Sequence, residues 1–124
     1  MHIKDLAERA GVTVRAVRYY ESRGLLTPRR EANGYRAYDD ADVHVVREVR
    51  ALLSLGMTAE ETHPFVECLR AGHDRADVCP ASLSAYRRRI ADVDARIAEL
   101  TALRAQLADL LGQAESYRTP QEAR

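Results

Sequence analysis

Between Leu83 and Leu100, apolar residues recur at alternating intervals of three and four positions. This spacing forms a continuous apolar stripe on one side of a helix and is typical of a coiled coil. Pro80 suits the first position of such a helix, which is predicted to span residues 80–112. No other segment is long enough to cover the stripe, so a second copy of the chain is expected to do so. The predicted dimer interface comprises Leu83, Tyr86, Ile90, Val93, Ile97, Leu100, Leu103 and Leu107. The last two residues, Leu103 and Leu107, shift the stripe by one position.

The N-terminal part of the chain predicts two short helices joined by a tight turn, over about residues 3–23. Ile3, Leu6 and Ala10 lie on one face of an amphipathic helix that Gly11 is expected to end. Thr13 is a suitable N-cap for the helix that follows. Two helices with this connection form a helix-turn-helix unit, whose second helix can enter the major groove of DNA.

The second of these helices carries a cationic and aromatic face. Arg15, Arg18, Tyr19 and Ser22 are spaced so that they point to the same side. Guanidinium groups and a phenol suit the phosphates and groove edges of DNA, because they donate hydrogen bonds with fixed geometry. A simple solvated helix surface is the alternative interpretation.

A basic wing is predicted over about residues 27–38. Asn33-Gly34 indicates a two-residue hairpin turn, flanked by strands of about three to four residues. Alternation along the second strand places Arg36 and Tyr38 on one face, and Arg29 and Arg30 lie on the incoming strand. A wing beside a helix-turn-helix is a more specific signal for DNA binding than a basic helix alone.

Charge is distributed unevenly along the 124 residues. Residues 1–38 contain eight Lys or Arg and four Asp or Glu, whereas residues 39–124 contain eleven and fifteen. The basic N-terminal part suits nucleic acid, and its modest charge predicts that two copies bind one site. The sequence shows neither a signal peptide nor a membrane span, so we expect a cytoplasmic protein. Two cysteines in that reducing compartment argue against a structural disulfide.

Two further helices are predicted at residues 40–55 and 58–72. Asp39 and Asp40 provide N-cap signals for the first, and Thr58 with Glu61 forms a capping box for the second. Pro64 is expected to bend the second helix. The resulting DNA-binding domain spans residues 1–72, followed by a hinge loop at 73–79, the dimerisation helix at 80–112 and a flexible tail at 113–124.

Together these motifs resemble the MerR family of bacterial transcription regulators over nearly all of residues 1–111. The resemblance rests on IKDLAERAGVTVRAVRYYESRGLL, the wing NGYRAY with DDADV, the junction ALLSLGMTAEE and the helix ending IAELTALRAQL. It implies an all-α dominated fold: a winged helix-turn-helix domain with a short β-hairpin wing, then a long antiparallel coiled-coil dimerisation helix. The residues that match family DNA contacts are Lys4, Thr13, Arg15, Arg18, Tyr19, Arg36 and Tyr38, with Arg30 and Asn33 as further candidates.

The resemblance also implies a mode of action. Two winged heads would bind a palindrome within a promoter whose spacer is unusually long. Family members bend and untwist that double-stranded DNA when their effector binds, so that RNA polymerase engages both promoter elements. The partners implied are therefore promoter DNA, a second copy of the chain and RNA polymerase.

The effector is less well defined by the sequence. Metal sensors of the family carry a Cys at the start of the dimer helix and further Cys after its end. Cys79 matches the first position, but the sequence contains no Cys after Leu111. Candidate effector residues are Cys79, Cys68, His73 and His63, and a thiol-bound metal ion at Cys79 is the one cofactor considered. Cys68 lies next to the apolar face of Phe65 and Leu69, which favours a small buried apolar residue over an effector ligand. Oxidation of the thiols, a small apolar ligand near the hinge, and no effector at all remain open alternatives.

Two classes of function follow from these features. The first is a regulator that controls transcription by distorting promoter DNA in response to an effector. The second is an effector-independent DNA-binding or architectural protein that recruits a partner through its coiled coil. An enzyme is not expected, because the sequence contains no catalytic triad order, P-loop or dinucleotide fingerprint.

Overall fold

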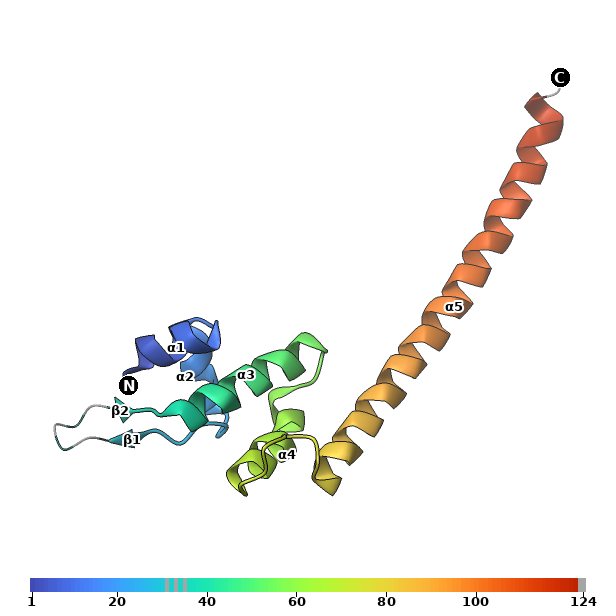
Figure 1. The fold of residues 1–124 in the computed structure, drawn as a ribbon. Helices are drawn as coiled ribbons and strands as arrows, with labels where there is room; N and C mark the ends of the chain where they lie inside the picture. Colours follow the sequence, from blue (N-terminus) through green and yellow to red (C-terminus); the bar gives the residue numbers. More distant parts are fainter. Residues whose placement is uncertain (31, 33, 35, 123–124) are drawn as a thin grey trace. The chain divides into compact units, whose positions relative to one another are not determined.

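The computed structural model describes residues 1–30, 32, 34 and 36–122 (Figure 1). The chain folds as two compact units, Met1–Tyr86 and Arg87–Arg124. The predicted helix-dominated fold with a short hairpin is confirmed. In chain order, the elements are α1 (Ile3–Ala10), α2 (Val14–Ser22), β1 (Arg29–Arg30), β2 (Arg36–Ala37), α3 (Asp40–Ser54), α4 (Ala59–Arg70) and α5 (Pro80–Glu122).

Backbone signals in the sequence define the helix-turn-helix. Gly11 follows α1 with a φ of 73°, a left-handed conformation that glycine adopts without steric cost. Its backbone N–H closes the helix on the carbonyl of Glu8 at 3.2 Å. The Thr13 side chain then accepts a hydrogen bond from the Ala16 N–H at 3.0 Å, which satisfies a free donor at the start of α2. The predicted C-cap and N-cap are both present.

The wing differs in detail from the prediction. β1 and β2 are two residues each and pair antiparallel, with Arg29 opposite Ala37 and Arg30 opposite Arg36. Five positions, 31–35, lie between the paired residues Arg30 and Arg36, and the predicted Asn33-Gly34 turn falls among them. Gly34 has a φ of 86°. A glycine with positive φ is common both in two-residue hairpin turns and in longer hairpin loops. Asn33 lies outside the described residues.

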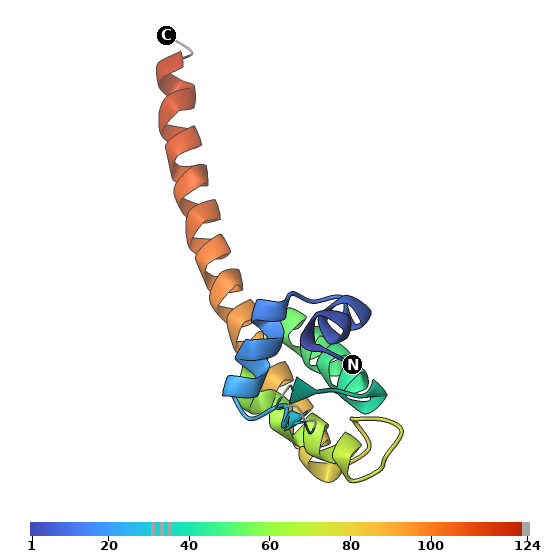
Figure 2. The ribbon, with the colours of Figure 1, turned by 90° about the vertical axis from the view of Figure 1, so that its left-hand side faces the viewer.

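The N-terminus completes the edge of the wing. The Met1 ammonium group donates to the Tyr38 carbonyl at 2.7 Å, and the Tyr38 N–H donates to the Met1 carbonyl at 3.0 Å. Figure 2 shows the N-terminal end of the chain beside the hairpin. These two hydrogen bonds attach Tyr38, which follows β2, to the N-terminus before α3 begins.

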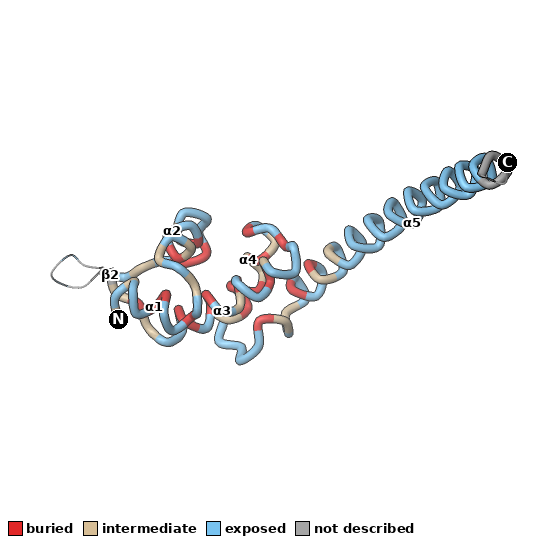
Figure 3. Tube along the Cα trace, turned by 90° about the horizontal axis from the view of Figure 1, so that it is seen from above, coloured by how far each residue is buried: buried red, intermediate tan, exposed pale blue. Residues whose placement is uncertain are grey.

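Buried residues concentrate in the unit Met1–Tyr86 (Figure 3). One cluster joins α1, α2 and α3 through residues such as Leu6, Val17 and Val46, each with no exposed surface. A second cluster lies between α4 and the first turns of α5 and centres on Phe65, whose ring centroid is 4.9 Å from that of Tyr86. Burial of this apolar surface is the main source of stability for the unit.

The start of α4 is fixed by the predicted capping box. The Thr58 hydroxyl accepts from the Glu61 N–H at 3.2 Å, and the Glu61 carboxylate accepts from the Thr58 N–H at 3.0 Å. Thr58→Ala is expected to lower the free energy of unfolding by about 1 kcal/mol, because one helix N–H loses its acceptor. Urea denaturation at a fixed protein concentration, followed by circular dichroism, measures this change. Thr58→Ser keeps the hydroxyl and serves as the control; equal stability of the Ala and Ser variants would contradict the expected role.

The apolar stripe of α5 is exposed beyond the first turns of the helix. Ile90 and Leu107, for example, are 59% and 67% exposed. Tyr86 is the exception among the predicted interface residues, because its ring is half-buried against Phe65 within the first unit. No helix among the described residues is long and apolar enough to cross a membrane.

The helix also continues past its predicted end at Gly112. The structure extends α5 to Glu122, where the sequence indicated a flexible tail over residues 113–124. Gln113, Ala114 and Glu115 are good helix formers. A single glycine costs about 1 kcal/mol within a helix, which is not enough to end one between such neighbours.

Candidate DNA-binding surface and thiol cluster

The outward face of α2 is built as the sequence predicted. Val17 and Tyr20 are buried in the core, which turns Arg15, Arg18 and Tyr19 toward solvent. Neither arginine forms an ion pair with any residue that the structure describes, so both guanidinium groups are available to an external anion. Two such guanidinium groups and a half-exposed phenol on one short helix are suited to hold phosphate oxygens.

Apart from Tyr38, the other predicted DNA contacts fall into three groups. Lys4 and Thr13 are exposed on the helix-turn-helix, although the Thr13 side chain already caps α2. Arg30 and Arg36 occupy opposite positions in the two strands of the wing. Asn33 lies outside the described residues.

Tyr38 is placed differently from the prediction. Its side chain is 3% exposed, and its hydroxyl donates a hydrogen bond to the carboxylate of Glu21 on α2. Strand alternation groups Tyr38 with Arg36, but β2 ends at Ala37 and the chain turns into the core before α3. Tyr38 therefore joins the wing to the second helix of the helix-turn-helix and is not presented on the surface.

A carboxylate pair anchors the wing to α3. Asp39 is the N-cap of α3 and forms an ion pair with Arg29 of β1. Asp39 and Asp42 accept each other's backbone N–H, at 3.1 Å and 3.0 Å. The hydrogen bond from the Asp42 N–H lowers the pKa of Asp39, whereas burial raises the pKa of Asp42.

The same pair is connected to α4. Arg70, the last residue of α4, brings its guanidinium to 3.7 Å from the Asp42 carboxylate. A continuous polar contact thus runs from the end of α4 through Asp42 and Asp39 to Arg29 in the wing. Sequence reasoning recognised the N-cap signal at Asp39 but missed the buried Asp42, although the Asp-x-x-Asp spacing of a reciprocal cap was visible.

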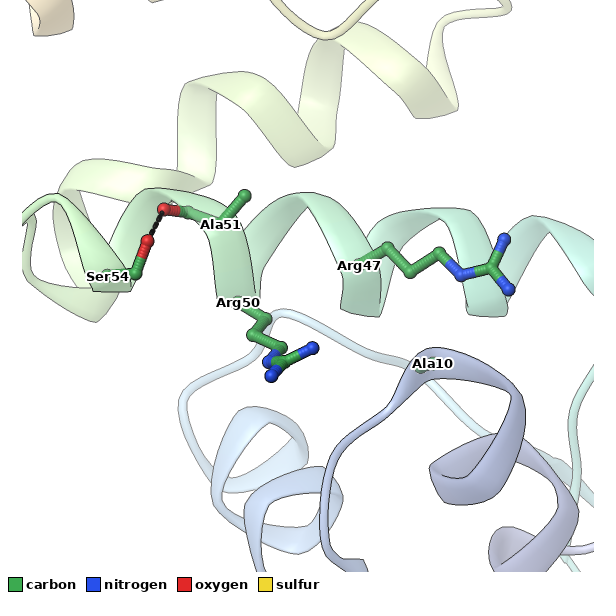
Figure 4. Close-up of a pocket in the computed structure, with 5 residues that line it drawn as sticks. All are labelled: Ala10, Arg47, Arg50, Ala51 and Ser54. Atoms are coloured by element: carbon green, nitrogen blue, oxygen red, sulfur yellow. Dashed lines mark hydrogen bonds between the residues drawn. The ribbon is translucent and has the colours of Figure 1, made fainter.

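A cationic groove lies between α3 and the end of α1 (Figure 4). It has a volume of about 440 Å³ and is lined by Ala10, Arg47, Arg50, Ala51 and Ser54. Arg47 donates a hydrogen bond to the carbonyl of Arg9 at 2.7 Å, which fixes its side chain against the end of α1. Sequence periodicity did not predict this groove, because it indicates only that Arg47 and Arg50 lie on the polar side of α3 and not that α1 ends beside them.

The two cysteines meet within the chain. Cys68 on α4 and Cys79 at the start of α5 form a disulfide, with their Cα atoms 5.9 Å apart. The sequence argued against a structural disulfide, whereas the structure joins the two sulfurs. That expectation rested on the redox compartment alone, whereas the pairing depends on how residues 69–78 fold back over α4.

Several contacts hold this returning loop in place. The Ser82 hydroxyl donates to the Ala76 carbonyl at 2.6 Å, and both residues are buried. Arg75 and Asp77 form a bidentate ion pair with contacts of 2.9 Å and 3.0 Å. Neither sulfur takes part in these contacts.

His73 completes a group of three potential metal ligands. One ligand atom each from Cys68, His73 and Cys79 lies within 4.8 Å of the others. Cys68 is buried, Cys79 is half-buried and His73 is exposed, so the group opens to solvent on one side. Two sulfurs and an imidazole are a suitable donor set for a borderline or soft metal ion when the thiols are free.

His63 was a further effector candidate, but the structure does not bring it to this group. Its Nε2 atom lies 3.0 Å from the carbonyl oxygen of Arg23, at the end of the helix-turn-helix. The four sequence candidates therefore separate into a cluster of three and one histidine that contacts α2's C-cap.

A helix-turn-helix with a wing and an exposed basic face defines a DNA-binding protein of the winged helix-turn-helix class. The family described as MerR HTH family regulatory protein matches residues 1–65, and the family described as MerR, DNA binding matches residues 43–110. The chain belongs to the MerR family of DNA-binding transcriptional regulators. This family consists of regulators rather than enzymes, in agreement with the expectation from sequence.

Similar proteins are found along most of the chain. The HTH-type transcriptional regulator HmrR of Rhizobium leguminosarum bv. viciae is 35% identical over 111 residues, covering 90% of this chain and 84% of HmrR. The lead(II) complex of PbrR691 from Ralstonia metallidurans CH34 has a TM-score of 0.67 and 33% identity, covering 89% of this chain and 84% of that one. HiNmlR, a MerR family regulator lacking the sensor domain and bound to promoter DNA, has a TM-score of 0.57 and 27% identity, covering 82% and 75%.

Proposed function

We propose that this chain is a homodimeric, metal-responsive regulator that binds a palindromic operator within a long-spacer promoter. It would control transcription, chiefly as an activator, by bending and untwisting the DNA between the promoter elements. The observation that carries the metal response is the meeting of Cys68, His73 and Cys79 at the start of α5. A regulator of this kind acts on chromosomal DNA together with RNA polymerase, in the cytoplasm.

The DNA contact is assigned to the exposed face of α2 and to the wing. Arg15 and Arg18 carry no ion-pair partner among the described residues, and Tyr19 is 49% exposed beside them. Lys4, Thr13, Arg30, Asn33 and Arg36 are retained as further contacts, whereas buried Tyr38 would act by positioning the wing. The DNA-bound structure of HiNmlR supports this mode of binding for a chain of similar fold.

Dimerisation is assigned to the stripe on α5. Its members from Ile90 to Leu107 are between 39% and 67% exposed, which is costly for a single chain in water. An antiparallel copy of the same helix would cover this stripe. Each subunit alone has a modest basic charge, so pairing two heads on one operator also raises the affinity for DNA.

The metal would be held by Cys68 and Cys79 as thiolates and by the imidazole of His73. Their chemistry fits zinc or a softer divalent ion, because thiolate and imidazole are the ligands that such ions prefer. A bound metal ion supplies an electrostatic and geometric link between its ligands. A series of contacts then joins the metal ligands to the wing. Cys68 lies on the last turns of α4, and Arg70 at the end of that helix contacts Asp42. Asp42 in turn supports the wing through Asp39. The lead(II) complex of PbrR691 supports metal as the effector class.

Transcription in vitro tests this proposal. The operator is first selected from random duplexes, placed in a promoter with a long spacer, and transcribed with the reduced protein in the presence of Zn²⁺. We expect Zn²⁺ to raise the amount of transcript with the wild-type protein. Cys79→Ser should abolish that response without changing operator affinity, because Cys79 lies outside the DNA-binding face.

The matched control is Ser84→Ala, which alters an exposed residue of the same helix and should respond like the wild type. A metal response that survives in Cys79→Ser would contradict the thiol site. Operator binding with no metal response in either protein would favour the effector-independent alternative, in which the coiled coil recruits a partner.

A further inference from the structure

We propose that Cys68 and Cys79 form a reversible thiol–disulfide switch, and that closing the disulfide prevents the site from binding metal. This inference rests on the proposed metal-responsive function and adds a second input at the same three residues. Oxidation would therefore act in opposition to the metal, so that the regulator responds to metal only under reducing conditions.

The two states compete for the same atoms. The structure joins the two sulfurs covalently, yet these sulfurs and the His73 ring also form the group that could hold a metal. A sulfur in a disulfide is not a thiolate and is a poor metal ligand. Tetrahedral binding with Zn–S bonds of about 2.3 Å would also require the sulfurs to lie roughly 3.8 Å apart, compared with about 2.0 Å in a disulfide.

The surrounding contacts favour reversibility. The bonds between Ser82 and Ala76 and between Arg75 and Asp77 hold the loop without involving either sulfur. Cys68 Sγ also lies 3.5 Å from the Arg75 carbonyl oxygen, so it is packed against the same loop. After reduction, the two thiols would remain adjacent, ready either to bind metal with His73 or to oxidise again.

Accessibility assigns different roles to the two cysteines. Cys79 is half-buried, whereas Cys68 is only 2% exposed, so a small-molecule disulfide in solution can reach Cys79 first. In the first step, the Cys79 thiolate attacks one sulfur of that disulfide, forming a mixed disulfide and releasing one thiolate. In the second step, the Cys68 thiolate attacks Cys79 Sγ, forms the intrachain bond and releases the second thiolate. The external disulfide gains the two electrons that the two cysteines lose.

The test uses the full-length protein and Zn²⁺ as the probe. Samples are either reduced, or oxidised with glutathione disulfide and freed of it, and Zn²⁺ affinity is measured by competition with a chromophoric chelator. Mass spectrometry records the disulfide in the same samples. We expect the oxidised protein to have lost about 2 Da per chain, to bind Zn²⁺ at least about 100-fold more weakly, and to regain affinity when reduced.

Three variants separate the roles of the ligands. His73→Ala should weaken Zn²⁺ binding by the reduced protein but still form the disulfide, because imidazole takes no part in the exchange. Cys68→Ser should accumulate a stable glutathione adduct at Cys79, whereas Cys79→Ser should react slowly at buried Cys68.

The outcomes distinguish this inference from the function on which it rests. Oxidised protein that binds Zn²⁺ as tightly as reduced protein, or reaction with glutathione disulfide that yields no intrachain bond, would overturn the switch alone. Reduced protein that binds no Zn²⁺, despite normal disulfide formation, would overturn the metal-responsive function and the switch with it.

Discussion

Ile90→Asp is expected to convert the proposed dimer into monomers. Ile90 lies in the middle of the exposed stripe of α5 and is 59% exposed in the single chain. Burying a side chain of this type is worth about 1.5–3 kcal/mol, and each dimer contains the substitution twice. A buried carboxylate adds a further cost, so the dissociation constant of the dimer should rise by about 10³-fold or more. Sedimentation velocity at several protein concentrations measures this change.

Ala95→Asp is the matched control for that experiment. Ala95 lies five positions after Ile90, on the opposite side of the heptad, and is exposed. It introduces the same charge away from the stripe and should leave the dimer intact. If Ile90→Asp sediments as a normal dimer while both proteins remain folded, the interface must lie elsewhere on the chain.

Arg18→Ala is expected to weaken operator binding by about 10²-fold or more. A charge-assisted hydrogen bond from a guanidinium to phosphate contributes roughly 1.5–3 kcal/mol, and both heads of the dimer lose it. Because two phosphate contacts disappear, the slope of log affinity against log salt should fall by about two. Fluorescence anisotropy with a labelled operator, measured over a range of salt concentrations, gives both quantities.

The control for Arg18→Ala must remove the same charge without touching the proposed DNA-binding face. Arg88→Ala does so, since Arg88 is exposed on α5 and lies outside the helix-turn-helix. It should change operator affinity and salt slope little. Circular dichroism should be unchanged in both variants, and normal binding by Arg18→Ala would remove the outward face of α2 from the DNA contact.

Local signals in the sequence predicted the helical parts of this fold well. Thr13, Thr58 and Asp39 cap the helices that they were expected to cap, because each cap depends on residues only three positions away. The outward face of α2 could be predicted for the same reason. Helical periodicity alone determines which side chains share a face once the core side is known.

Features that depend on distant parts of the chain were harder to predict. Tyr38 and Tyr86 were expected on functional surfaces, but Tyr38 is buried beside Glu21 and Tyr86 is half-buried against Phe65. The pairing of Cys68 with Cys79 depends on a loop whose path is fixed by Ser82 and a buried alanine carbonyl. Strand alternation describes only neighbouring positions, and a cysteine count describes only composition. Neither can predict contacts between distant parts of the chain.

The polar chain from Arg70 through Asp42 and Asp39 to Arg29 has a practical meaning for protein engineering. None of its four members belongs to residues 71–78, the connection that contributes His73. The loop between α4 and α5 could therefore be replaced by one with different donor atoms, while the polar contacts between α4 and the hairpin are kept. Under the proposed function, the donor atoms of this connection could then be changed while Arg70, Asp42, Asp39 and Arg29 stay as they are.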